Sequence, residues 1–440
     1  MAVDSVPRAH APNASGMAGP PDGPRRLDVN YGIFVHYVPG LSVDGVGKPA
    51  SLDELCSLFD LGGFVADVVA FGVEYVRFTA WHQGMFPLYP SDVMTHWRGE
   101  RSSSSRDIIG ELIEALSKEG IATQLYTHPR DGHDMDRRDQ ERTGWGATAP
   151  IGNPDPDPRS FVFSRWNDFI TEAYAELVDR YGSRVQSIYW DEGSERADST
   201  WVVDYERLRQ TILSRAEHLV IQQNFYGNLY SADVADHEYY RWGDFAESTL
   251  DHWPAYRTQS VSTVLGSIWW AGRATQFEIG FSPEDLLGYL AIQTAVNITG
   301  GGLAIAAGPL VGGGWEPGVR EALIELARRL KPIRKSIVGA RPSSRWPAPD
   351  RSTATTLDWV VATENDEATY VHVLRRPTSG RVLLPRRASD DIPRSALCVR
   401  SGAEVGVSVT ESALELTMRM ESWDEHHTVI ELRYPGEGER

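Results

Sequence analysis

The strongest chemical signal in this 440-residue sequence is an aspartate at the end of an apolar run. Asp191 follows Ser187-Ile-Tyr-Trp190 and precedes Glu192 and Gly193. An unpaired carboxylate at the end of a buried strand is costly, so the acid is either held by a cap or salt bridge or used in catalysis. One reaction that uses such an acid is glycoside hydrolysis, in which an ionised carboxylate works beside a protonated one.

A partner acid for Asp191 has two candidates further along the chain. Glu247 lies in the aromatic-rich segment Tyr240-Arg-Trp-Gly-Asp-Phe-Ala-Glu247, and Glu238 lies in Asp236-His-Glu238-Tyr. We expect both in loops beyond the strands. The proton donor of a glycosidase has to keep its proton near neutral pH, which requires an environment shielded from water that raises its pKa. Spacing alone does not choose between the two, and either is also readable as a solvated loop acid.

Histidine and aromatic side chains at other predicted strand ends are suited to holding a sugar. Imidazoles hydrogen bond to hydroxyl groups, and aromatic rings stack on the C–H faces of sugars. The alternative for each of them is ordinary packing in the core. The candidate substrate-binding residues are His36, His82, Trp81, Tyr126, His128, Trp190 and Trp269.

Two other kinds of active site have little support in the sequence. His36, His82, His128 and Asp191 offer metal-ligating atoms, but the sequence contains no HxH pair and no HExxH motif, so a metal centre is not expected. A serine nucleophile is not expected either, because no GxSxG elbow occurs.

The elements that would position these residues alternate between strand and helix. Helical spacing of apolar residues marks 108–116 and 319–330, and this alternation predicts a parallel sheet. A distorted (β/α)8 barrel of the TIM type is favoured over an open sheet, because no GxGxxG or Walker loop follows the first strand. The predicted strands are 31–37, 74–80, 122–127, 185–191, 218–223 and 303–307.

Beyond Pro342 the pattern changes to short β-branched runs separated by turn residues, which is typical of an all-β sandwich. The prediction is therefore a flexible tail over 1–26, a catalytic α/β barrel over 27–342 and a β-sandwich over 343–440.

Charge and composition narrow the partners and the location. Acidic residues outnumber basic ones 61 to 43, giving a net charge of −18, so nucleic acid and membrane partners are disfavoured. Two cysteines do not make a disulfide framework. With neither a signal-peptide pattern nor an apolar run of about 18 residues, we expect a cytoplasmic protein. The oligomeric state is left open.

Several segments, in order, resemble the α-L-fucosidases of glycoside hydrolase family 29. Tyr31-Gly-Ile-Phe-Val-His36-Tyr is similar to the opening WGIFIHWG strand, and Ile188-Tyr-Trp-Asp191-Glu-Gly193 matches the position of WFDG. Further similar segments are 71–89 (AKY…TAKHHDGFCLW in the family), 106–126 (GRD…GLKxGLYYS), 301–309 (GGNLLLNIGP) and 330–342 (ending in IYGTRP).

The resemblance implies a barrel followed by a β-sandwich and a retaining mechanism through a covalent glycosyl–aspartate. By position, Asp191 would be the nucleophile, and His36 and His82 would hold the sugar. The acid/base differs between subgroups; Arg241-Trp242-Gly-Asp-Phe-Ala-Glu247 resembles the RWxGNE of one of them, which selects Glu247 with Glu238 in reserve. No metal or organic cofactor is implied.

The sequence departs from the family at sugar-contacting positions. The second histidine of KHHDGF is Gln83, its lysine is Trp81, and the arginine of NDRWG is Phe225. We therefore expect a retaining exo-glycosidase for an α-L-fucosyl-like or related deoxy sugar, carried by a small molecule such as a natural product. The alternative is a repurposed barrel that binds or otherwise transforms a sugar-containing metabolite.

Overall fold

The structure, a computed structural model, describes most of the chain between residues 25 and 435. The described residues are 25–40, 42, 51–82, 84–99, 102–149, 155–191, 200–224, 231–239, 259–266, 269–271, 279–346, 360–386 and 392–435. The predicted tail, apart from Arg25 and Arg26, lies outside these ranges.

Eight parallel strands close into a barrel in the order of the sequence, which confirms the predicted fold class. Six of them coincide with predicted strands, whereas β6 and β7 were not anticipated from the sequence. The strands are β1 (Tyr31–Val35), β2 (Tyr75–Thr79), β3 (Ala122–Thr127), β4 (Ser187–Trp190), β5 (Val220–Asn224), β6 (Val234–Tyr239), β7 (Gln259–Val264) and β8 (Leu303–Ala306).

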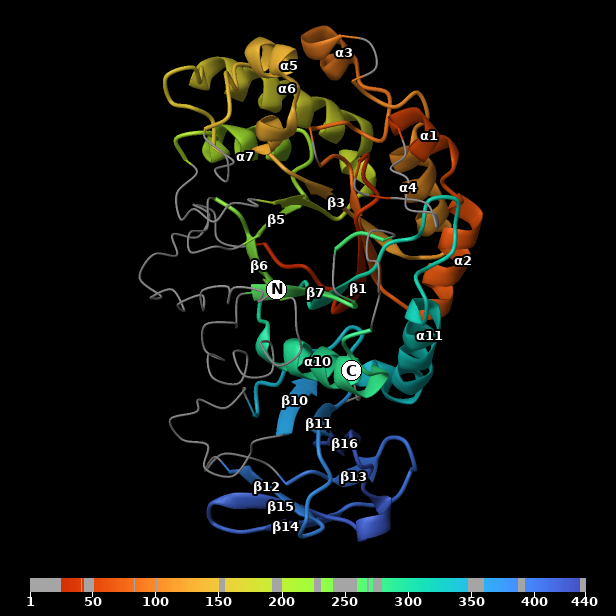
Figure 1. The fold of residues 1–440 in the computed structure, drawn as a ribbon. Helices are drawn as coiled ribbons and strands as arrows, with labels where there is room; N and C mark the ends of the chain where they lie inside the picture. The colour runs from red at the N-terminus through yellow and green to blue at the C-terminus, as the bar shows by residue number, and fades with distance from the viewer. Residues whose placement is uncertain are drawn as a thin grey trace, which may run out of the picture.

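Helices pack around the barrel (Figure 1), with α4 against β3 and α10 against β8. In α4 the residues Ile108, Ile109, Leu112, Ile113 and Leu116 are all buried, as their spacing predicted. The Asp107 carboxylate accepts from the Gly110 N–H at 2.8 Å and caps this helix. The helices are α1 (Leu52–Ser57), α2 (Leu61–Phe71), α3 (Asp92–Arg98), α4 (Ile108–Lys118), α5 (Arg137–Thr143), α6 (Phe163–Tyr181), α7 (Tyr205–Leu213), α10 (Pro283–Val296) and α11 (Val319–Leu330).

A buried arginine organises the inside of the barrel. The Arg77 guanidinium donates to Asp236 at 3.1 Å, Ser262 at 2.7 Å, Gln222 at 2.7 Å and Gln124 at 3.3 Å. These side chains come from strands β2, β3, β5, β6 and β7, so one charge ties most of the barrel together. Because its counter-ion and its other acceptors are all in place, the ion pair is tolerated in a dry interior.

Two antiparallel sheets follow the barrel, as expected for a sandwich. One has the order β13-β16-β11-β10-β9 and the other β12-β15-β14. The predicted boundary falls within β9, which already pairs with β10, and the exact division into domains stays a prediction. The strands are β9 (Arg341–Pro342), β10 (Val360–Glu364), β11 (Thr369–Val373), β12 (Arg381–Pro385), β13 (Ser395–Cys398), β14 (Gly406–Val409), β15 (Ala413–Thr417) and β16 (Thr428–Arg433).

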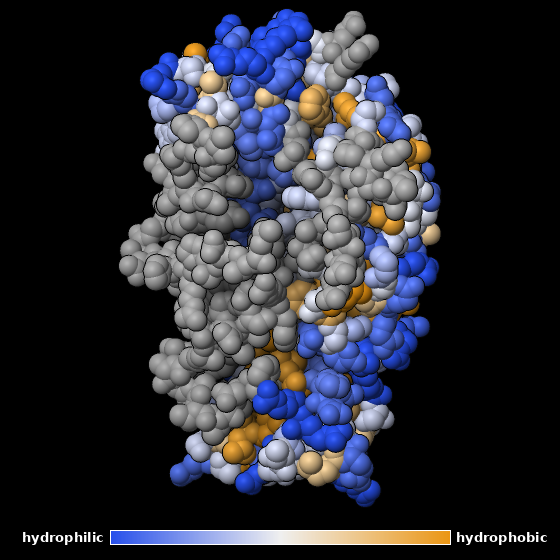
Figure 2. Space-filling view, in the orientation of Figure 1, coloured by the Kyte–Doolittle hydropathy of each residue, from blue (hydrophilic) through white to orange (hydrophobic). Residues whose placement is uncertain are grey.

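The described surface in Figure 2 is mostly hydrophilic, in line with the charge of the chain, with an apolar strip toward the C-terminal sheets. Among the described residues, no helix combines the length and the apolar character needed to cross a membrane.

Two buried histidines join the first C-terminal sheet to the end of the barrel. The Thr363 hydroxyl donates to the Ser336 carbonyl at 2.7 Å, so its oxygen accepts from His372 Nε2 at 2.9 Å. His372 Nδ1 then carries the lone pair that accepts from His427 Nε2–H at 3.0 Å. This chain of hydrogen bonds requires His372 to be neutral, because a proton on His372 Nδ1 would face the His427 N–H. His427 Nδ1 is buried without a hydrogen-bond partner among the described residues, so a proton there would be costly as well.

The free energy of unfolding is expected to fall in mild acid because of this pair. Burial, with the charge of Arg400, lowers the pKa of His427 to about 3, and burial beside His427 takes the pKa of His372 well below its usual value. The unfolded chain takes up protons below about pH 6.5, whereas the folded chain does not, so stability is lost as the pH falls. At pH 5 we expect a loss of about 2 kcal/mol for each imidazole.

Denaturant unfolding at pH 7.5 and pH 5 measures this loss. The double substitution H372Q/H427Q should flatten the pH dependence, and H426Q is the matched control because His426 is exposed. An unchanged slope in the double variant would show that other groups cause the acid sensitivity.

Candidate active site

Asp191 lies directly after β4, and its N–H donates to the Thr127 carbonyl at 2.8 Å, which continues the ladder with β3. Its buried carboxylate accepts from the Tyr126 hydroxyl and from the Asn224 amide at 2.9 Å. Burial alone would raise the pKa of Asp191, but the charges of His128 and His82, together with these two hydrogen bonds, hold the pKa below its ordinary value. The carboxylate is therefore ionised at neutral pH.

Glu238 is the second acid that the structure brings to this point. The sequence interpretation put it in a loop, but it lies on β6, two residues after the inward-facing Asp236. Asn224, which binds Asp191, also hydrogen bonds Glu238. Burial, then the negative charges of Asp191 and Asp236, raise the pKa of Glu238 well above its usual value.

The two carboxyl groups thus differ in protonation within one site. They share a hydrogen-bonding partner, and the charge on Asp191 is itself a cause of the raised pKa of Glu238. Divergent pKa values in two neighbouring acids are the arrangement that acid–base catalysis needs. Glu247, preferred on the sequence, lies within 240–258 and so outside the described residues.

The two histidines of the predicted sugar site face each other at 5.6 Å between ring centroids. The Thr79 hydroxyl donates to the Val35 carbonyl, so His36 Nδ1–H donates to Thr79 Oγ1 at 3.1 Å and leaves Nε2 free to accept. Burial, then the charge of His82, take the pKa of His36 well below its usual value, and it is neutral.

His82 is in the opposite state. Its Nδ1 donates to Asp131 Oδ2 at 2.7 Å. Burial opposes the charged ring, but the charge of Asp131 and this hydrogen bond raise the pKa of His82 above its usual value. The His128 ring stacks on His82 at 5.3 Å between centroids, with an angle of 11° between the ring planes. The site therefore presents one neutral and one readily charged imidazole.

The predicted aromatic residues divide into two groups. The ring of Tyr126 stands edge-on to His36 at 4.6 Å and that of Trp269 at 6.2 Å, so both belong with the histidines. Trp190 instead packs against Tyr205, because neighbouring residues of a strand face opposite ways and Asp191 takes the inward side.

Trp81 is likewise fully buried, edge-on to Tyr174 of α6 at 5.0 Å. Both tryptophans join the core between barrel and helices, and neither is among the site's ring contacts.

Two residues of the candidate site are not predicted from the sequence, Asn224 and Asp131. Asn224 is not among the predicted site residues, although its amide bridges the two acids. Asp131 is also absent from the predicted residues. Its signal in the sequence is weak, an acidic Asp131-Gly-His-Asp134 turn separated by three residues from the end of the predicted strand 122–127.

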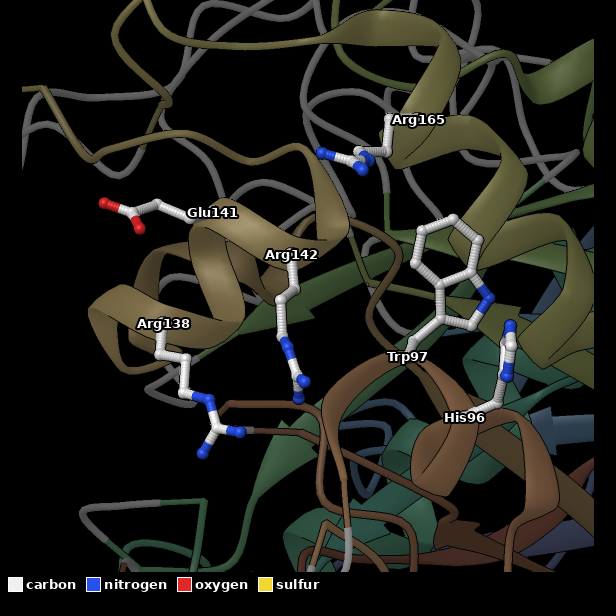
Figure 3. A pocket seen from close by; sticks show the side chains of 6 residues that line it. All are labelled: His96, Trp97, Arg138, Glu141, Arg142 and Arg165. Atoms are coloured by element: carbon white, nitrogen blue, oxygen red, sulfur yellow. The ribbon is translucent and has the colours of Figure 1, made fainter.

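The described cavities lie elsewhere on the molecule. One of about 440 Å³ is framed by α3, α5 and the start of α6 (Figure 3). Trp97 and His96 project from α3, Arg138 and Arg142 from α5, and Arg165 from α6, whereas Glu141 points away from them. It contains no facing pair of acids and none of the predicted site residues.

Curated relatives match the chain over short stretches. The "Putative alpha-L-fucosidase 1" of Oryza sativa subsp. japonica is 28% identical over 146 residues, which cover 29% of this chain and 28% of that protein. The "Putative alpha-L-fucosidase" of Caenorhabditis elegans is 30% identical over 98 residues, covering 22% of this chain and 19% of that protein. The chain thus spans less than a third of the length of either relative.

Solved structures match nearly the whole fold. α-L-Fucosidase isoenzyme 1 from Paenibacillus thiaminolyticus has a TM-score of 0.66 and 18% identity, covering 92% of this chain and 96% of that one. A family 29 α-L-fucosidase from Bacteroides thetaiotaomicron, trapped as a covalent intermediate in complex with 2-fluoro-fucosyl fluoride, has a TM-score of 0.67 and 16% identity, covering 94% of this chain and 98% of that one.

At this identity the structural likeness shows a shared fold. The family is shown by the sequence, because a model of the family described as Alpha-L-fucosidase matches residues 55–331, more than half of the chain. The barrel, the sandwich and this match together place the chain in the α-L-fucosidase family of glycoside hydrolases.

Proposed function

We propose that the protein is a retaining exo-glycosidase that removes a terminal α-L-fucosyl-like or related deoxy sugar. The observation that carries the proposal is the pair of acids at the barrel mouth, one ionised and one protonated, joined through Asn224. The trapped covalent intermediate of the Bacteroides relative supports the same chemistry for this chain.

In the first step, Asp191 attacks the anomeric carbon while Glu238 gives its proton to the leaving glycosidic oxygen. The bond from Asp191 Oδ to the anomeric carbon forms as the bond to the leaving oxygen breaks. In the second step, Glu238, now ionised, takes a proton from water as the water displaces Asp191. His36 and His82 would hold sugar hydroxyls, the neutral His36 by accepting a hydrogen bond and His82 by donating one.

The pKa of Glu238 changes during this cycle because the charge of Asp191 changes. While Asp191 is ionised, its field raises the pKa of Glu238 and keeps the proton there. Once Asp191 forms an ester with the sugar, that field disappears and the pKa of Glu238 falls. Glu238 is thus an acid when an acid is needed, and a base afterwards.

We also propose that the substrate is a small-molecule glycoside met in the cytoplasm, such as a sugar-bearing natural product. Support comes from the departures at Trp81, Gln83 and Phe225, which alter positions that contact fucose in the family, while the nucleophile position is kept. Trp81 packs into the core and has no charged group to offer a sugar.

Covalent trapping tests the reaction. The protein is incubated with 2-deoxy-2-fluoro-α-L-fucosyl fluoride, digested and analysed by peptide mass spectrometry. We expect one fluorosugar on the peptide that contains Asp191, and hydrolysis of an aryl α-L-fucoside that this label blocks. A sugar that binds but never labels the protein, with no hydrolysis of aryl glycosides of fucose or related deoxy sugars, would favour the repurposed barrel.

A further inference from the structure

A histidine-rich cluster lies beside the proposed catalytic acids, where the segments after β2 and β3 meet. One ring nitrogen from each of His82 and His128 and one carboxylate oxygen of Asp131 lie within 4.8 Å of one another. His82 follows β2, and His128 and Asp131 follow β3. The proposed reaction uses His82 through the sugar and gives Asp131 no direct role.

Asp131 is the least expected member of this cluster. Its side chain is fully buried, and Oδ1 has no hydrogen-bond donor among the described residues. His133 Nδ1 lies 3.8 Å from Oδ1, which is too far for a hydrogen bond. A buried carboxylate oxygen without a donor is costly, so something else is expected to satisfy it.

We propose that His82, His128 and Asp131 bind a divalent transition-metal ion, with Zn²⁺ as the ion of choice. Two imidazoles and one carboxylate are a ligand set that suits zinc, and water completes a tetrahedral shell. Donor atoms around a tetrahedral zinc ion lie about 3.4 Å apart, so the three ligand atoms, which lie within 4.8 Å of one another, need to close in by up to about 1.4 Å. A hard oxygen-seeking ion such as Ca²⁺ is not expected, because two of the three ligands are nitrogens.

The ion would be structural and separate from bond cleavage. It would join the segment after β2 to the turn after β3, both of which form the wall of the site that holds His36 and Tyr126. Bonds from His82 and from Asp131 to the ion would also replace the hydrogen bond between these two residues. The ion would then provide a partner for Asp131 Oδ1, which has no hydrogen-bond donor among the described residues. The competing explanation is that no ion binds, and that the hydrogen-bonded ion pair of His82 and Asp131 only orients the His82 ring.

Metal binding to the full chain, measured without any sugar, separates these explanations. Protein stripped with a chelator is dialysed against Zn²⁺ or Ca²⁺ and its metal content is measured. We expect one Zn²⁺ and no Ca²⁺ per chain, with Zn²⁺ affinity at least about 10-fold weaker in D131N and in H128Q. H96Q is the matched control, because His96 is exposed on α3 and outside the cluster.

The carboxylate of Asp134, which is close to Asp131 in sequence, provides a test of which residues hold the ion. Asp131, His133 and Asp134 form an overlapping group, so D134N should keep full affinity if the ion is held as proposed. Loss of binding in D134N with retention in H128Q would overturn the assignment, as would failure of the unaltered chain to bind Zn²⁺.

Co²⁺ bound to the unaltered chain should give the visible absorption of a tetrahedral nitrogen-containing site, a result that no folding defect of a variant can mimic. Because none of these measurements involves hydrolysis, they fail or succeed independently of the proposed reaction.

Discussion

Replacing Asp191 with glycine is expected to lower kcat for an aryl α-L-fucoside by at least about 10⁴-fold, because no covalent intermediate can form. The substitution also leaves a space next to the Asn224 amide and the Tyr126 hydroxyl, two donors that are prepared for an anion. Azide added to this variant should therefore restore part of the rate and give a glycosyl azide of inverted configuration. Steady-state kinetics and product analysis by NMR measure both effects.

The control for this experiment is D157G. Asp157 is also a hydrogen-bonded carboxylate, but it pairs with Arg159 at the surface and should be dispensable for catalysis. Full activity in D191G would contradict the assigned nucleophile. An α-azide product, formed with retention, would do so as well, because direct displacement of an α-linked group by azide has to invert the anomeric carbon.

The activity lost in the variant E238Q is expected to depend on how much the leaving group needs a proton. For an alkyl glycoside, whose oxygen needs a proton, kcat/KM should fall by about 10²–10⁴-fold. For a dinitrophenyl glycoside, whose leaving group needs none, formation of the intermediate should be nearly unchanged. A plot of log(kcat/KM) against leaving-group pKa, steeper in the variant than in the parent enzyme, measures this difference.

The pH profile gives a second measurement of the same residue. Glu238 acts while protonated, so kcat/KM falls as the pH rises through its pKa. Burial and the charge of Asp191 raise that pKa, so the alkaline limb should lie well above the usual glutamate value of about 4.3. In E238Q this limb should disappear, since the amide does not titrate.

E247Q is the matched variant, because Glu247 was the acid preferred on sequence grounds. If Glu238 is the acid, E247Q should keep both the alkaline limb and the leaving-group dependence of the parent. The opposite outcome, with these changes in E247Q and none in E238Q, would return the role to Glu247 and leave Asp191 as the nucleophile.

How far the sequence predicts the barrel depends on how apolar each strand is. β1, β2, β3, β4, β5 and β8 were predicted because inward and outward residues are both largely apolar in most of them, as in Leu303–Ala306. β6, with the sequence VADHEY, and β7, with QSVSTV, were missed. Asp236 and Ser262 on these strands bind Arg77, and polar residues that are satisfied only by a distant strand look like loop residues in a sequence.

The candidate site was predictable where strand ends carry the chemistry, as with Asp191, His36 and His82. The prediction failed where the direction of a side chain decides whether a residue belongs to the site. Asp191 points into the barrel, so Trp190 before it has to face the helices, a consequence of strand geometry that composition does not reveal. Asp131 could not be predicted, because its contact with His82 joins two separate loops.

The Arg77 cluster sets a limit on how this pocket can change. Its guanidinium lies 4.4 Å from the centre of the Tyr189 ring, and the partners below Glu238 are already committed to one another. A substitution that removed one of these partners would leave a buried charge without compensation, which usually costs several kcal/mol. New sugar preferences are therefore expected to arise at positions outside the Arg77 cluster, while the cluster itself remains unchanged.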